Sequence, residues 1–319
     1  MKIVFMGTPE YAATIMRAVY DAGHEITAVY TQPDKPKGRS KELVAPPVKE
    51  LSISLNIPVF QPERIKAPEE VERLSHIDAD IFVVAAFGQF LSSEILNMPK
   101  FGCVNAHGSL LPKYRGASPI QRAIANGESQ TGVTIMQMDV GMDSGDILSK
   151  VIVPITEDDD EESMYNKLAD AGAKLMVETL RDIEARAVTP IPQNPDEVTF
   201  AKMLTKQDGL VNFEKSAHLI DCMIRGYSTW PGAYTYINGK MLKLTKASVL
   251  KNDDPQFDEI SDAGKDFESG AMLVTKKRLF VKTGDGILEL ISVRPEGKPC
   301  MGACDFARGA RIETGNMLG

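Results

Sequence analysis

The chain has 319 residues and a formal net charge of −8, with 36 lysine and arginine residues against 44 aspartate and glutamate residues. This balance argues against a protein that binds nucleic acid simply through its overall charge. The length suffices for one large domain or two ordinary ones, and a hydrophobic content of 43% is typical of globular proteins. Four cysteines without zinc-site spacing indicate free thiols in a reducing compartment. We therefore expect a cytoplasmic protein with no membrane span and no metal.

The first half of the chain reads as strands that alternate with helices. Lys2–Met6 and Glu25–Tyr30 are predicted strands, and Asp80–Phe87 has the continuous apolar pattern of a strand buried on both faces. Gly7-Thr8-Pro9 turns the first strand into a helix, but it lacks the G-x-G-x-x-G pattern. A dinucleotide site is therefore unsupported.

A proline-rich, basic segment follows the second strand. Residues 32–47 contain four prolines, three lysines and Arg39, and they show no periodic pattern. A structureless loop of this length is usually functional or disordered. A solvated surface loop explains the composition equally well.

The chain is organised around the stretch Asn105–Pro119, N-A-H-G-S-L-L-P-K-Y-R-G-A-S-P, which follows a predicted strand at 101–104. Side chains alternate faces along a strand, so Asn105 and His107 should point the same way. In open α/β sheets, ligands bind at such strand ends. Taken alone, N-x-H is also compatible with a polar strand end and a hydrogen-bonded histidine.

A second polar cluster, M-D-V-G-M-D-S-G-D at 138–146, comes after a strand predicted at 131–138. Asp143 lies between two glycines, which permit unusual backbone angles. Such a loop is usually a solvated turn or a cation site, but a carboxylate here could instead orient the imidazole and favour its charged form. Asn105, His107 and Asp143 together suit a reaction that forms an oxyanion. The sequence does not show whether Asp143 reaches His107.

These two motifs resemble the signatures of the methionyl-tRNA formyltransferases, one branch of the superfamily that uses 10-formyltetrahydrofolate. The features typical of this branch are H-G at 107–108, A-S-P-I-Q at 117–121 and Q-P-D-K-P-K-G-R at 32–39, and the resemblance extends over nearly the whole chain. It implies that Asn105, His107 and Asp143 are catalytic. It also implies a folate site at Phe87, Gly88, Ser109, Leu110, Leu111 and Pro112, and tRNA contacts at Arg39 and Lys206.

The last third of the chain differs in pattern from the rest. A long helix predicted at 161–186 is followed by Pro190, Pro192 and Pro195, which suggest a semi-rigid spacer between domains. Beyond it lie one helix at 216–225, an Asn238-Gly239 hairpin signal and several short strands, which suggest a small barrel. Residues 210–319 hold 15 basic and 14 acidic side chains, so the acidic excess lies in the first two thirds.

The resemblance implies a Rossmann-like, mostly parallel sheet in a formyltransferase domain at 1–189, a linker at 190–208 and an OB-like barrel that binds tRNA at 209–319. The expected reaction transfers the formyl group of 10-formyltetrahydrofolate to the methionine amino group of initiator methionyl-tRNA. One alternative is a formyltransferase for a small amine, such as a nucleotide sugar or a purine precursor; another is a non-catalytic RNA-binding protein. A monomer is expected on the resemblance alone.

Overall fold

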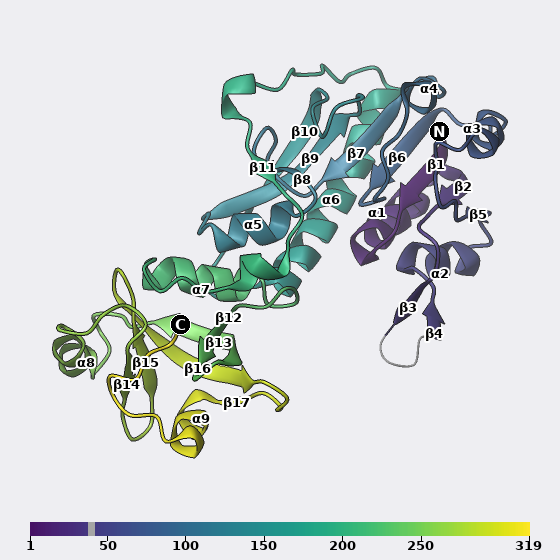
Figure 1. Ribbon diagram of the computed structural model, residues 1–319. Coiled ribbons are helices and arrows are strands. Elements are labelled where there is room, and N and C mark those ends of the chain that lie inside the picture. Colours follow the sequence, from purple (N-terminus) through teal and green to yellow (C-terminus); the bar gives the residue numbers. More distant parts are fainter. Residues whose placement is uncertain (38–41) are drawn as a thin grey trace. The chain divides into compact units, whose positions relative to one another are not determined.

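The computed structural model describes residues 1–37 and 42–319 (Figure 1). Contacts divide the chain into two compact units, each built from separate stretches of sequence. The first unit consists of Met1–Pro119, Gln130–Pro154 and Met164–Lys202, and the second of Ile120–Ser129, Ile155–Ser163 and Met203–Gly319. The boundaries predicted from sequence, 1–189 and 209–319 with a linker between them, are continuous and stay a prediction.

The first elements of the described residues run from the N-terminus into the central motif. They are β1 (Lys2–Gly7), α1 (Glu10–Asp21), β2 (Glu25–Tyr30), β3 (Lys35–Lys37), β4 (Glu42–Val44), α2 (Pro47–Ser54), β5 (Val59–Phe60), α3 (Pro68–Ser75), β6 (Ile81–Ala85), α4 (Ser93–Leu96), β7 (Cys103–His107) and β8 (Arg115–Gly116). There follow α5 (Pro119–Ala125), β9 (Gln130–Gln137), β10 (Ile147–Pro154), α6 (Glu161–Glu184), the 3-10 turn η1 (Pro195–Glu197) and β11 (Phe200–Ala201).

The first unit is built on a seven-stranded sheet with the order β10-β9-β7-β6-β1-β2-β5. Neighbouring strands are parallel from β7 to β5, whereas β9 runs antiparallel to both β7 and β10. The predicted Rossmann-like, mostly parallel sheet is therefore confirmed. From β1 the chain adds β2 and β5 on one side of the sheet, and from β6 it adds β7, β9 and β10 on the other. The strand order therefore reverses between β1 and β6. The carboxyl end of β6 borders this position, where α/β folds bind ligands, and that of β7 lies one strand further along the sheet.

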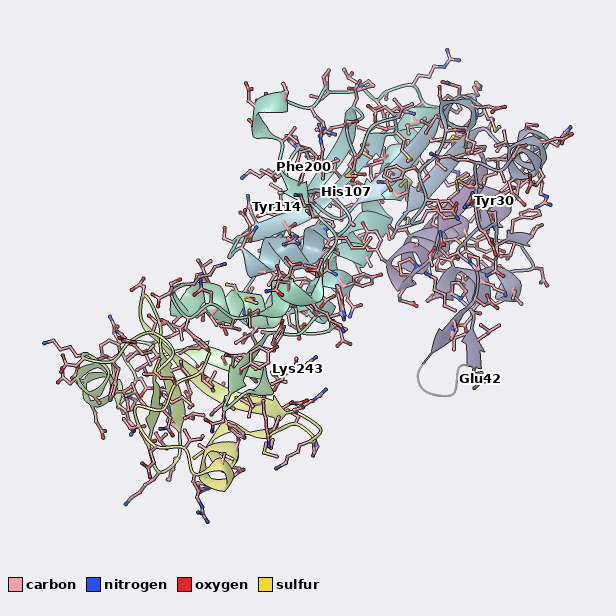
Figure 2. All side chains as sticks on the ribbon, viewed as in Figure 1. Tyr30, Glu42, His107, Tyr114, Phe200 and Lys243 are labelled. Atoms are coloured by element: carbon pink, nitrogen blue, oxygen red, sulfur yellow. The ribbon has the colours of Figure 1, made fainter. Side chains whose placement is uncertain are left out.

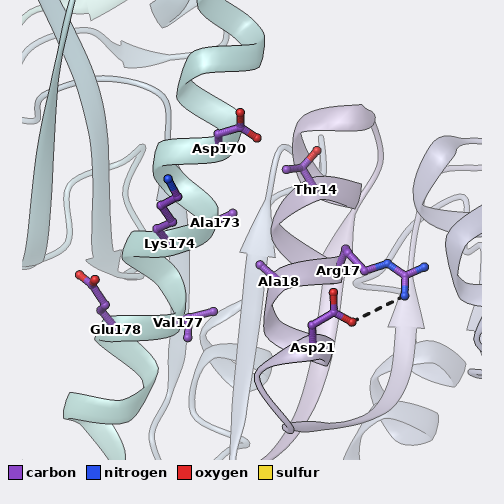
Figure 3. Close-up of a pocket in the computed structure, with 9 residues that line it drawn as sticks. All are labelled: Thr14, Arg17, Ala18, Asp21, Asp170, Ala173, Lys174, Val177 and Glu178. Carbon is purple, nitrogen blue, oxygen red and sulfur yellow. Dashed lines mark ion pairs between the residues drawn. The ribbon is translucent and has the colours of Figure 1, made fainter.

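Helices cover both faces of this sheet, which is why its central strands are apolar throughout. On one face, Val71 and Leu74 of α3 and Ile95 of α4 pack against strand residues such as Val84. On the other, the Tyr11 hydroxyl of α1 donates to the Ala106 carbonyl of β7 at 3.4 Å, and α6 lies beside α1 (Figure 3). The central strands therefore have no solvated face, and polar groups concentrate at their ends.

Three local expectations need correction. The strand expected at 101–104 is β7, Cys103–His107, so both polar residues of the N-x-H motif are strand residues. The segment 32–47 is not wholly structureless, because β3 and β4 pair antiparallel within it, Lys35 opposite Val44. The proline-rich spacer is partly built into the first unit: Ile191 exchanges backbone hydrogen bonds with Ile147, and β11 pairs with β8.

The second unit contains an antiparallel sheet with the order β12-β13-β16-β15-β14, and β17 pairs with β16. Asn238 and Gly239 both have positive φ in the turn between β12 and β13, which confirms the predicted hairpin. The sheet curls into an OB-like half-barrel, as expected. Its elements are η2 (Lys206–Gly209), α7 (Ala217–Gly226), β12 (Tyr234–Ile237), β13 (Lys240–Val249), α8 (Phe257–Ala263), β14 (Met272–Val274), β15 (Leu279–Lys282), β16 (Ile287–Pro295), β17 (Met301–Gly302) and α9 (Ala303–Ala310).

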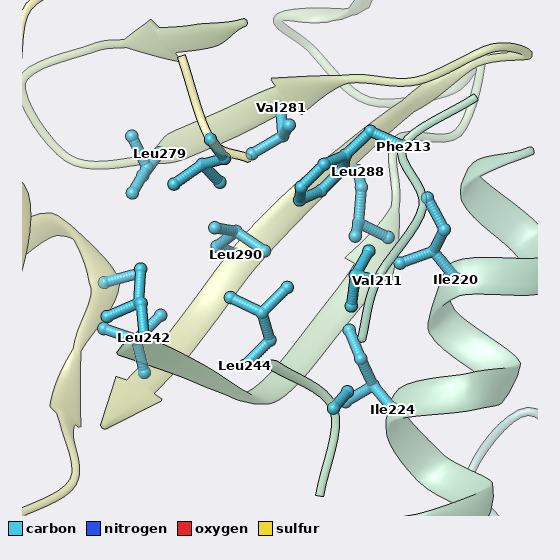
Figure 4. Close-up of a cluster of buried hydrophobic side chains, with 14 of the residues drawn as sticks. Val211, Phe213, Ile220, Ile224, Leu242, Leu244, Leu279, Val281, Leu288 and Leu290 are labelled. Atoms are coloured by element: carbon cyan, nitrogen blue, oxygen red, sulfur yellow. The ribbon is translucent and has the colours of Figure 1, made fainter. Parts of the chain in front are cut away.

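A continuous apolar core holds the half-barrel and α7 together (Figure 4). Leu242, Leu244 and Leu290 project from β13 and β16 toward Ile220 and Ile224 of α7, and all five are nearly or fully buried. Alternate residues of β13 face this core, which accounts for the period-2 pattern in its sequence. Among the residues that the structure describes, no helix is long and apolar enough to cross a membrane.

Candidate active site

The two polar residues of β7 lie where the sheet registers predict. Asn105 is opposite Met136 of β9 and His107 opposite Thr134, so the two side chains leave the strand on the same face. Both are largely buried, with 9% of Asn105 and 6% of His107 exposed. Within residues 1–37 and 42–319, the Asn105 side chain makes no hydrogen bond. Its amide is thus available to a substrate oxygen.

The two nitrogens of His107 have different surroundings. Nε2 lies 2.9 Å from the Tyr114 carbonyl oxygen, and because a carbonyl only accepts, Nε2 carries a hydrogen. Nδ1 lies 3.7 Å from Asp143 Oδ2, beyond hydrogen-bond distance but suited to an ion pair when the ring is protonated. His107 and Tyr114 are labelled in Figure 2. The structure therefore brings together the histidine and the aspartate that the sequence left unconnected.

The carboxylate of Asp143 is held by the backbone of a second motif. Its Oδ2 accepts a hydrogen bond from the Gly116 backbone amide at 2.8 Å. Asp143 itself has φ +48°, the left-handed conformation that non-glycine residues adopt at a cost of about 1–2 kcal/mol. The same oxygen thus faces a backbone donor and the imidazole, while the surrounding fold has to maintain a strained backbone.

Gln193, which the sequence interpretation did not single out, holds the backbone of the aspartate loop. Its side-chain amide nitrogen donates to the carbonyls of Asp143 at 2.8 Å and Gly145 at 2.7 Å. Its amide oxygen accepts from Nε and Nη2 of Arg115 at 3.0 and 2.8 Å. Gln193 lies 50 residues after Asp143 in a proline-rich stretch, so no local pattern indicated its position.

A second residue of the same stretch supports the histidine. The Thr199 hydroxyl accepts from the Tyr114 backbone amide at 2.8 Å, and the Thr199 carbonyl accepts from the Arg115 amide at 2.9 Å. Tyr114 has φ +60° and presents its carbonyl to His107. The segment 191–201 therefore contacts both Tyr114, whose carbonyl bonds to His107, and the backbone of Asp143.

The predicted folate residues of the S-L-L-P motif form a tightly bonded loop. The Ser109 hydroxyl donates to the Lys113 carbonyl at 2.6 Å, and both Ser109 and Leu111 are fully buried. Thr134 of β9 donates to the Ser109 carbonyl at 2.7 Å and accepts from the Leu111 amide at 3.1 Å. Leu110 is partly buried and Pro112 follows a cis peptide bond. Internal bonds therefore already occupy the polar groups of Ser109 and Leu111.

The other predicted folate residues lie just after β6. The Phe87 side chain is 2% exposed and belongs to the core beneath α3 and α4. Its carbonyl accepts from Thr8 Oγ1 at 3.2 Å and Gln32 Nε2 at 3.1 Å. Gly88 has φ +82°, which permits the sharp turn at the end of the strand. The phenyl ring therefore belongs to the core, and the Phe87 carbonyl is already hydrogen-bonded within the first unit.

The remaining features are the two residues predicted to contact tRNA and a groove in the first unit. Arg39 falls outside the described residues, and Lys206 is an exposed residue of η2 in the second unit. A groove between α1 and α6 is lined by Arg17, Asp21 and Lys174, among others, and by none of the predicted site residues (Figure 3). No cluster of three or more potential metal ligands occurs in the described part of the chain.

Asn105 and His107 at the end of β7, with Asp143 beside the histidine, suit a reaction that forms an oxyanion, and similarity to known proteins identifies the class. The family described as Formyl transferase matches residues 1–180, and Formyl transferase, C-terminal domain, matches residues 203–311. The chain belongs to this family.

Individual proteins within and beyond this family also resemble the chain. Methionyl-tRNA formyltransferase of Agathobacter rectalis is 44% identical over 319 residues, with 100% of this chain and 99% of the relative covered. That of Lachnospira eligens is 46% identical over 321 residues, with both chains covered completely. Several solved structures are similar in fold. WlaRD, a sugar 3N-formyl transferase, has a TM-score of 0.67 and 18% identity, with 94% of this chain and 99% of that chain covered. An N-formyltransferase from Helicobacter canadensis, in complex with folinic acid and dTDP-3-aminofucose, has a TM-score of 0.67 and 18% identity, with 91% of this chain and 98% of that chain covered.

Proposed function

We propose that this chain transfers the formyl group of 10-formyltetrahydrofolate to the α-amino group of methionine on initiator methionyl-tRNA. The observation that carries the proposal is the pairing of His107 with Asp143 beside the unbonded Asn105 amide at the end of β7. The acceptor is inferred from relatives that match over their whole length and carry the name methionyl-tRNA formyltransferase.

Asn105 is proposed to bind the oxygen of the reacting formyl group. When the neutral amine attacks the formyl carbon, the carbonyl oxygen becomes an oxyanion that needs hydrogen-bond donors. The Asn105 amide supplies one such donor, and its near-complete burial strengthens the interaction because water does not compete. Protonated His107 stabilises the same negative charge.

Asp143 and His107 are proposed to handle the proton. The attacking amine loses a proton as the new C–N bond forms, and N10 of the folate gains one as its bond to the formyl carbon breaks. With Nε2 bonded to Tyr114, Nδ1 of His107 is the nitrogen directed toward Asp143. The carboxylate would orient the imidazole and relay the proton, through a water molecule, from the amine to N10.

The folate site is proposed to lie between the turn after β6 and the S-L-L-P loop. Phe87 and Gly88 follow β6, and Leu110 to Pro112 follow β7 within the same unit. The first segment adjoins the position where the strand order reverses, and the second follows the neighbouring strand. Solved structures similar in fold contain a folate: folinic acid in the Helicobacter canadensis protein, and tetrahydrofolic acid in HypX from Aquifex aeolicus.

For the tRNA, we propose contacts by Arg39, Lys206 and the half-barrel of the second unit, which corresponds to the domain predicted at 209–319. The near-neutral charge of residues 210–319, against the acidic remainder, makes this the more favourable surface for a polyanion. We further propose that the enzyme acts in the cytoplasm as a monomer.

A small-amine acceptor is the second candidate, because two of the similar solved structures are sugar formyltransferases. The decisive assay measures formyl transfer to charged initiator tRNA, with an amino sugar nucleotide offered as a competing acceptor. We expect transfer to the tRNA with little inhibition by the competitor. Rapid formylation of the amino sugar, with none of the tRNA, would refute the proposed acceptor.

A further inference from the structure

Gln193 closes a ring of hydrogen bonds around the proposed catalytic aspartate. The Asp143 carboxylate accepts from the Gly116 amide, and the Arg115 side chain next to Gly116 donates to the Gln193 oxygen. Gln193 then donates back to the Asp143 carbonyl at 2.8 Å. The ring joins β8, the aspartate loop and the proline-rich stretch, so each part limits the movement of the others.

Chemistry fixes the orientation of the Gln193 amide. A guanidinium has only donors and a carbonyl only accepts, so the amide oxygen must face Arg115 and the nitrogen must face Asp143 and Gly145. All four hydrogen bonds are 2.7 to 3.0 Å long. A glutamate of the same shape would retain the Arg115 contact but direct a carboxylate oxygen at two carbonyl oxygens. The position therefore requires a group that accepts on one side and donates on the other.

The aspartate loop needs such a support. Residues 139–142 on one side of Asp143 are exposed, and Asp143 itself has a left-handed backbone. At Gly145, a Cβ atom would lie 1.7 Å from the Gln137 carbonyl oxygen, so this end of the loop is packed directly on β9. Gln193 bonds to the carbonyl groups of both Asp143 and Gly145, and so ties the strained residue to the packed one.

We propose that Gln193 is a positioning residue, which holds the Asp143 backbone so that its carboxylate faces Nδ1 of His107. In this proposal Gln193 acts through Asp143 and not on a substrate, so the inference rests on the proposed catalytic role of Asp143. The function of the aspartate thus depends on a side chain from the stretch that the sequence predicts as a spacer.

The test compares variants of the full chain in the formylation of charged initiator tRNA. Gln193→Ala should lower kcat by about 25- to 100-fold, the loss expected when the two hydrogen bonds to the aspartate loop, worth about a factor of five to ten each, are removed. The KM values for tRNA and folate should change less than twofold, because ground-state binding is untouched. Gln193→Glu should have a kcat as low as that of Gln193→Ala, although glutamate has the shape of glutamine. A parental kcat in Gln193→Glu would show that Gln193 acts through packing.

A double-variant experiment separates this inference from the proposed function. In an Asp143→Ala background, Gln193→Ala should change kcat less than twofold, because the residue through which it acts is gone. Asn194→Ala is the matched control, since this neighbouring exposed amide only caps a local turn, and it should stay within twofold of the parent. Parental kcat in Gln193→Ala, or an equal loss in both backgrounds, would overturn the positioning role. Parental activity of Asp143→Ala would instead refute the catalytic role of the aspartate.

Discussion

Replacing Asp143 by asparagine tests the charge of the proposed catalytic aspartate with little change of shape. Asparagine tolerates the left-handed backbone of this position and can still accept the Gly116 hydrogen bond through its amide oxygen. What is lost is the attraction between the carboxylate and a protonated His107. At the observed 3.7 Å this attraction is worth roughly 1 kcal/mol in water and about 4 kcal/mol at an effective dielectric constant of 20.

Since 1.36 kcal/mol corresponds to a tenfold change in rate, Asp143→Asn should reduce kcat by about 10- to 10³-fold. The loss should lie nearer the upper end, because only 7% of the His107 side chain and 19% of the Asp143 side chain are exposed. Steady-state formylation of charged initiator tRNA gives kcat and both KM values, and a thermal melt checks that the variant is folded. A folded variant with kcat within threefold of the parent would refute the electrostatic role of the aspartate.

Four further predictions follow from the proposal and the packing. Asn105→Ala should lower kcat by about 10²- to 10³-fold, the loss typical of one oxyanion donor, and a smaller change in the same assay would remove Asn105 from that role. Arg39→Ala should raise the tRNA KM or lower kcat with folate binding unchanged, and Arg39→Lys should restore activity only in part, because a guanidinium binds phosphate through two hydrogen bonds. Leu242→Ala, in the core of the half-barrel where Leu242 is fully buried, should cost about 2–5 kcal/mol of stability in denaturant unfolding. Hydrogen bonds from Arg278 lower the pKa of Asp254 in the folded state. Their stabilisation is therefore present above about pH 4 and is lost as the pH falls through the pKa of the folded state. Thermal melts of Asp254→Asn should accordingly depend less on pH below about 4 than those of the parent.

Periodicity predicted most of the regular structure, because long elements repeat the same environment many times. Glu25–Tyr30 has the predicted bounds, and α6 ends two residues before the prediction. The β3 and β4 pair was missed because strands of three residues are too short to establish a period. Helix α9 was missed for a related reason: its buried face consists of Ala303, Phe306 and Ala307, and alanine is a weak apolar signal.

In the candidate site, local spacing predicted some of the geometry, whereas contacts between residues far apart in the sequence could not be predicted. The i, i+2 spacing predicted that Asn105 and His107 share a face, because strand geometry alone decides it. The approach of Asp143 to His107 was expected from a resemblance and could not be derived from spacing. Gln193 and Thr199 were not singled out at all. Their contacts with Arg115 and Tyr114 span 78 and 85 residues, and nothing in the local sequence specifies such a partner.

The contacts of the segment 191–201 also bear on when the site can form. When the growing chain has emerged from the ribosome as far as residue 189, it contains Asn105, His107 and Asp143. It still lacks Gln193 and the strand β11, which pairs with β8. Pairing between residues this far apart in the sequence is slow, because the entropy of loop closure must be offset before the contacts form. The arrangement of the proposed catalytic residues is therefore completed late in folding, and a catalytic fragment designed for transplantation has to include the chain through Ala201.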